Sequence, residues 1–153
     1  MNGHCVPSAA ATSQGFTLVE TLIALAIVAL VTTFAVPQYT AYIARSRLLD
    51  GFVKLSDYRS QMEQYFLDRR TYLDDAGGCG VAPFATATAD AFTVTCTATA
   101  TTFIYTAVGI ASKGLNSFRF TIDETGARST LSVPPGWSRT PDCWTFRQDG
   151  GCA

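Results

Sequence analysis

The hydrophobic residues of the chain are concentrated in one N-terminal block. Residues 16–36 are predominantly apolar with Glu20 as the one charged residue, and no charged residue occurs from Thr21 to Ala44. At about 1.5 Å of helical rise per residue, a block of about 21 residues matches the hydrocarbon thickness of a bilayer. A domain this small cannot cover a helix that is apolar on all sides. We therefore predict a transmembrane helix over residues 16–44.

Residues 45–72 have a different, amphipathic pattern. Apolar residues recur at spacings of three or four positions or at sums of these, and the charged residues lie mostly off this stripe. The pattern predicts that the helix resumes after Pro37 and buries one face. The turn-forming residues 74–78 end the helical signal, so we expect the helix to reach about Tyr72. The predicted buried face consists of Leu48, Phe52, Leu55, Met62 and Phe66.

Residues 73–153 predict a small antiparallel sheet. Apolar residues from Phe92 to Ala98 alternate with threonines, as in a half-buried strand. Further strands are expected at 102–108, 117–123 and 127–133, and a tight turn joins the last two. We therefore predict an α+β fold in which a long N-terminal helix packs on a four-stranded antiparallel sheet.

Composition limits the function classes. The chain has 153 residues and a net charge of −1, and its one histidine is His4. If the N-terminal segment is removed, no imidazole remains for acid–base or metal chemistry, so we expect neither an enzyme nor a cofactor. Near-neutral charge also argues against a general nucleic-acid binder. Five basic residues of the globular part suggest a DNA-contacting strip, but acidic neighbours outnumber them and favour a mixed surface. They are Lys113, Arg119, Arg128, Arg139 and Arg147.

The junction before the apolar block is the most informative motif. Gly15 directly precedes Phe16, and Glu20 is the fifth residue from that phenylalanine. A carboxylate is costly in lipid unless it meets a cation. Cleavage after Gly15 would create such a cation, because the new α-amino group of Phe16 in one helix could pair with Glu20 of a neighbouring helix.

This junction, GFTLVE, resembles the prepilin-peptidase motif of the type IV pilins, and the run ALVTTFAVPQYTAYIARSR resembles the rest of their N-terminal segment. The resemblance implies that residues 1–15 are a leader that prepilin peptidase removes and that Phe16 becomes N-methylated. It further implies that Glu20 sets subunit registration and that Pro37 marks a helix break or kink. Residues 16–44 would then form the filament core.

The resemblance also implies a location and a role. We expect a single-pass inner-membrane protein with a cytoplasmic N-terminus, which is then assembled with other pilin subunits into an extracellular pilus. The expected function is that of a structural subunit, of the minor-pilin type, that supports motility, adhesion or DNA uptake. Two alternatives stay open: a pseudopilin of type II secretion, and a DNA-receptor pilin.

Four cysteines remain after removal of the leader, and an even number suits an oxidising compartment. Three pairings are possible. We favour Cys79–Cys96 and Cys143–Cys152, since each closes a short local loop, and the second resembles the C-terminal disulfide loop of the type IV pilins. A four-cysteine zinc site is disfavoured because neither pair has the spacing of a zinc knuckle.

Overall fold

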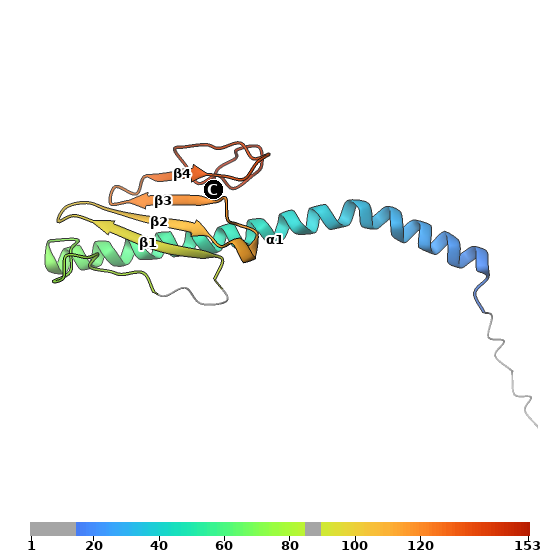
Figure 1. Cartoon of the computed structure of the whole chain (residues 1–153), viewed down its shortest axis with the longest axis horizontal. Coiled ribbons are helices and arrows are strands. Elements are labelled where there is room, and N and C mark those ends of the chain that lie inside the picture. Colours follow the sequence, from blue (N-terminus) through green and yellow to red (C-terminus); the bar gives the residue numbers. More distant parts are fainter. Residues whose placement is uncertain (1–14, 85–89) are drawn as a thin grey trace, which may run out of the picture. The chain divides into compact units, whose positions relative to one another are not determined.

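The computed structural model describes residues 15–84 and 90–153, without the side chains of residues 34–38, 40 and 41. The chain divides into two compact units, Met1–Tyr39 and Thr40–Ala153, which we call the N-terminal unit and the head. The elements in chain order are α1 (Leu18–Arg69), β1 (Phe92–Ala98), β2 (Phe103–Gly109), the 3-10 helix η1 (Ala111–Lys113), β3 (Arg119–Asp123) and β4 (Arg128–Ser132) (Figure 1).

Helix α1 begins and ends where local chemistry requires it. The Thr17 Oγ1 accepts a hydrogen bond of 3.2 Å from the Glu20 backbone N–H, which caps the first turn. At the other end, Arg70 has φ of 58°, a left-handed conformation that cannot continue a right-handed helix. The helix therefore ends three residues earlier than the sequence pattern predicted.

The described part of the N-terminal unit presents apolar side chains to solvent. Phe16 is 83% exposed, and Leu22, Ile23, Ile27 and Val28 are between 56% and 58% exposed. We expected a membrane span over residues 16–44. Within the described residues, no helix combines the length and the apolar character needed to cross a membrane.

The sheet of the head has four antiparallel strands in the order β1-β2-β3-β4, as predicted. One rung of paired residues, Thr95, Thr106, Thr121 and Ser129, crosses all four strands. Residues paired in this way share a face, and this rung belongs to the outer face. The pairing of β3 with β4 shifts by one residue, since Phe120 pairs with Thr130 but Arg119 pairs with Ser132. This irregularity changes the face that the β4 residues after Thr130 occupy.

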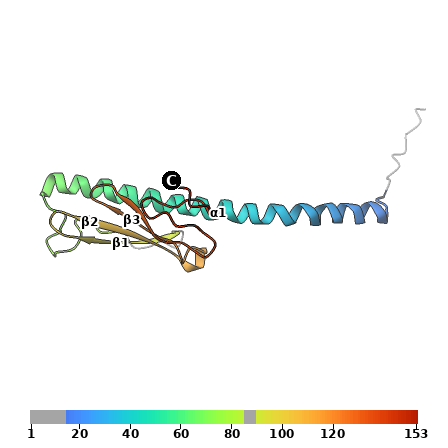
Figure 2. The same ribbon diagram turned by 90° about the horizontal axis from the view of Figure 1, so that it is seen from above.

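The core of the head lies between α1 and the inner face of the sheet (Figure 2). Each large apolar side chain buried here contributes about 1.5–3 kcal/mol. Four of the five residues predicted for the helix face are buried, and Phe66 is half-buried against them. The main contributors are Leu48, Phe52, Leu55 and Met62 of α1, with Tyr105, Phe120 and Trp144 opposite.

Candidate functional site

The predicted cleavage junction lies ahead of the helix. Gly15, Phe16 and Thr17 have no regular secondary structure, and all three are exposed. Among the described residues, no atom outside its two chain neighbours lies within 4 Å of the position that a Cβ of Gly15 would occupy. The peptide bond between Gly15 and Phe16 is thus open to solvent in this structure, and its cleavage stays a prediction.

Glu20 lies in the first turn of α1, among exposed apolar neighbours. The capping hydrogen bond from its backbone N–H to Thr17 was not predicted from the sequence. The signal was present, because Thr17 followed by Glu20 three residues later is the spacing of a capping box. The position of Glu20 therefore also suits the positive end of the helix dipole.

Pro37 lies inside α1, whose helical assignment continues on both sides of it. Proline lacks the N–H that would bond to the preceding turn, so one helical hydrogen bond is missing there. The side chain of Pro37 is outside the described residues, and its part in assembly stays a prediction.

The first disulfide joins Cys79 to Cys96, as we favoured, with the Cα atoms 6.2 Å apart. Cys79 also forms an isolated antiparallel bridge with Leu73, and Cys96 belongs to β1. This disulfide therefore fastens the segment that follows α1 to the first strand of the sheet.

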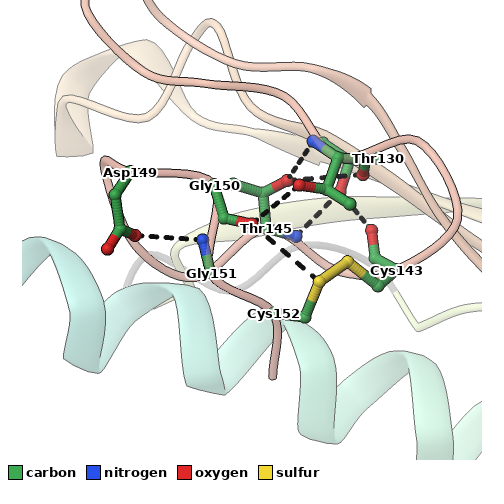
Figure 3. Close-up of a disulfide and its surroundings, with 8 residues drawn as sticks. Thr130, Cys143, Thr145, Asp149, Gly150, Gly151 and Cys152 are labelled. Atoms are coloured by element: carbon green, nitrogen blue, oxygen red, sulfur yellow. Dashed lines mark hydrogen bonds between the residues drawn. A yellow bond between two sulfur atoms is a disulfide. The ribbon is translucent and has the colours of Figure 1, made fainter.

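The second predicted disulfide, Cys143–Cys152, closes the C-terminal loop, with the Cα atoms 5.9 Å apart (Figure 3). Buried threonines hold this loop to β4, which the sequence did not reveal. The Thr130 Oγ1 donates to the Cys143 carbonyl oxygen at 2.5 Å and accepts from the Thr145 N–H at 2.8 Å. The Thr140 Oγ1 donates to the Gly150 carbonyl oxygen at 2.7 Å. The loop is therefore fixed by polar contacts as well as by the disulfide.

Trp144 connects this loop to the core. Its ring is stacked on Phe52 of α1 with centroids 4.9 Å apart, and its Nε1 donates to the Thr121 carbonyl oxygen at 2.8 Å. The Arg128 guanidinium lies 4.6 Å from the centroid of the Trp144 ring. Because the indole is buried, it serves packing and is not a stacking platform for a ligand.

The structure does not bring the five candidate DNA-contacting cations into one strip. Lys113 and Arg119 lie in η1 and at the start of β3, where Arg47 of α1 donates to the Lys113 carbonyl oxygen at 2.6 Å. The other three, Arg128, Arg139 and Arg147, belong to β4 and the C-terminal loop, and we call them the loop cations. All three are exposed.

The five cations share one electrostatic property. In the part of the chain that the structure describes, none of them has a carboxylate oxygen within 4.0 Å. Among the described residues, the basic ones that do form ion pairs are Lys54, Arg59 and Arg69, all of α1. No carboxylate of the described residues thus neutralises these cations, although Arg139 donates to the Thr130 carbonyl oxygen at 3.1 Å.

Lys54 and Tyr105 have pKa values that reflect local structure. Burial acts to lower the pKa of Lys54, but its hydrogen bond to Asp90 and the charges of Asp50 and Asp90 raise it overall. Burial raises the pKa of Tyr105, whose hydroxyl donates to the Val81 carbonyl oxygen at 2.6 Å. Both groups therefore keep their protons at neutral pH and serve structure.

A long N-terminal helix, a four-stranded antiparallel sheet and a disulfide-closed C-terminal loop define the class of the type IV pilins. Residues 11–36 match the family described as "Prokaryotic N-terminal methylation motif". Residues 37–127, more than half of the chain, match "Type IV minor pilin ComP, DNA uptake sequence receptor". The chain belongs to this family of type IV minor pilins.

Similar proteins agree with this class. Fimbrial protein EcpC of Eikenella corrodens is 30% identical over 69 residues, which cover 45% of each chain. Type IV major pilin PilE of Neisseria gonorrhoeae is 32% identical over 69 residues, which cover 45% of this chain and 41% of the relative. The major fimbrial protein FimA of Dichelobacter nodosus is 36% identical over 66 residues, 43% of this chain and 40% of the relative. The match thus spans less than half of these relatives, and no comparison supports a secretion pseudopilin.

Proposed function

We propose that the chain is a structural, non-enzymatic minor subunit of a type IV pilus, cleaved after Gly15 and N-methylated at Phe16. The match of residues 11–36 to the methylation motif and the solvent-open junction support this processing. In this proposal prepilin peptidase acts while the uncharged segment from Thr21 to Ala44 is held in the inner membrane. The subunit then leaves the membrane for the extracellular filament.

In the filament, the apolar side chains that the N-terminal unit exposes are covered by the helices of other pilin subunits. Burial of each contributes about 1.5–3 kcal/mol, which drives assembly. Glu20 pairs with the methylated α-amino group of Phe16 in a neighbouring subunit and so fixes the stagger of the helices. Mass spectrometry of the mature chain tests the processing, and an N-terminus other than methylated Phe16 would contradict it.

We further propose that the head binds DNA through the loop cations. The family description supports this second role, and so does the lack of carboxylate partners for these residues. The sequence favoured a mixed surface because acidic residues outnumber basic ones over residues 73–153 as a whole. In the structure, the carboxylates of the C-terminal loop, Asp142 and Asp149, form no ion pair with these arginines, so the arginines can contact phosphates.

Salt dependence tests this role. The full chain in detergent micelles is titrated with labelled duplex DNA, with and without an uptake sequence, over a series of NaCl concentrations. Because each phosphate contact contributes about 0.9 to the slope of log K against log salt, the variant Arg139→Gln/Arg147→Gln should lower this slope by about 2. The matched control Arg69→Gln removes a cation at the end of α1, outside β4 and the C-terminal loop, and should leave the slope unchanged. If the unaltered chain, the double arginine variant and the Arg69→Gln control all had the same slope of log K against log salt, DNA binding at the loop would be contradicted.

A further inference from the structure

Apart from those of β4 and the C-terminal loop, the charged side chains of the head are sorted between its two ends. One end holds the close of β2, η1 and the start of β3, and there Arg47 of α1 bonds to the Lys113 carbonyl oxygen. We call this the proximal end. It carries five cations and two carboxylates, namely Arg45, Arg47, Lys54, Lys113 and Arg119 with Asp50 and Asp90.

The opposite, distal end holds the close of α1 and the turns β1–β2 and β3–β4. The Arg59 Nη2 donates to the Glu124 carbonyl oxygen at 3.4 Å, which places α1 beside the β3–β4 turn. From Asp57 of α1 onward, this end carries seven carboxylates and three cations. They are Asp57, Glu63, Asp68, Asp74, Asp75, Asp123 and Glu124 with Arg59, Arg69 and Arg70. The two ends therefore have net charges of opposite sign.

The excess charge of each end is accessible. At the proximal end both carboxylates engage Lys54, and no ion pair within the described residues takes up Arg45 or Arg119, which are exposed. At the distal end the Asp75 side chain is 97% exposed, and its partner Arg69 is 3.9 Å away and itself 59% exposed. Such a pair is weak and exchanges readily for another partner.

We propose that the proximal end of one head binds the distal end of the head of a second copy of this chain. Two different, complementary patches on one molecule make a heterologous contact, which can repeat along a filament. Complementary charge also fixes the register of neighbours. The uncharged stretch from Thr21 to Ala44 cannot provide register along its own length, so the charged ends of the head supply it beside Glu20. The proposal rests on the filament-subunit role and is independent of DNA binding.

Charge reversal tests the contact in the full chain. Self-association in detergent micelles is measured by analytical ultracentrifugation at low and high NaCl for Arg119→Glu, Asp75→Lys and the double variant. Each single reversal should weaken association at low salt about tenfold, because attraction becomes repulsion at the contact. The double variant exchanges the signs across the same contact and should recover most of the loss.

The control Thr95→Glu adds a carboxylate on the outer sheet face in the middle of the edge strand β1, away from both ends, and should associate as the unaltered chain does. Absence of recovery in the double variant, or an equal loss in Thr95→Glu, would overturn the proposal. So would a loss of binding to anionic vesicles in Arg119→Glu with self-association unchanged, since the proximal end would then bind lipid. Failure of the filament role is distinguishable, because the unaltered protein would be missing from sheared pili.

Discussion

The hydroxyl of Thr130 should carry a large share of the stability of the C-terminal loop. Thr130 is fully buried, and Thr130→Val keeps its shape while removing the Oγ1 that bonds to the Cys143 carbonyl oxygen and the Thr145 N–H. Each lost hydrogen bond costs about 1 kcal/mol, and a buried group left without a partner adds to this. We expect a loss of about 2–3 kcal/mol in the free energy of unfolding, or roughly 10 °C in Tm for a domain of this size.

Thermal unfolding of the full chain in detergent micelles, followed by near-UV circular dichroism, measures this loss. The matched control is Thr95→Val, the same substitution on the exposed face of the same sheet, where the Oγ1 makes one long contact of 3.5 Å. The control should change stability by less than about 0.5 kcal/mol. Equal Tm values for the two variants would refute the view that the buried hydroxyl holds the loop to β4.

Two further predictions concern the loop and a turn. Cys143→Ser/Cys152→Ser should lower the free energy of unfolding by about 3 kcal/mol, because the unfolded chain gains entropy when its loop is opened. Cys79→Ser/Cys96→Ser should lower it by about 0.5 kcal/mol more, because the loop that this disulfide closes is longer. Denaturant unfolding that shows no loss in either variant would contradict this. For Asp123, burial raises the pKa, but hydrogen bonds from Thr125 and from the turn backbone lower it overall, below the ordinary 3.8. Its contribution to stability is therefore present at neutral pH and is lost as the pH falls through the folded-state pKa. The Tm gap between the unaltered chain and Asp123→Asn should then shrink from pH 7 to pH 3, and a constant gap would count against it.

The parts of the fold that depend on local pattern could be predicted from the sequence. Alternation from Phe92 to Ala98 indicated β1 because side chains of a strand alternate between faces. The pairs Cys79–Cys96 and Cys143–Cys152 were predictable because each closes a short loop. The extent of α1 was also predictable within a few residues, since its buried stripe has helical spacing.

The parts that depend on distant contacts could not be predicted. Arg128 pairs with the buried Ile122, so its side chain lies on the inner side of the sheet and covers Trp144 instead of joining Arg119 on the outer face. The register shift at Arg119 and Phe120 contributes to this, and no local signal marks it. The threonine contacts of the loop are likewise long-range, because Thr130 meets Cys143 and Thr145 only after the loop has folded back.

The C-terminal loop also limits which contacts the β4 edge of the head can make with a neighbouring subunit. As the last strand, β4 would expose backbone groups that invite another strand to add to the sheet. Here the Thr130 N–H donates to the Pro141 carbonyl oxygen at 3.1 Å, and the Thr130 carbonyl oxygen accepts from Arg139 at 3.1 Å. These groups are therefore unavailable for strand addition at the centre of that edge. Contacts between heads at this edge must then use side chains.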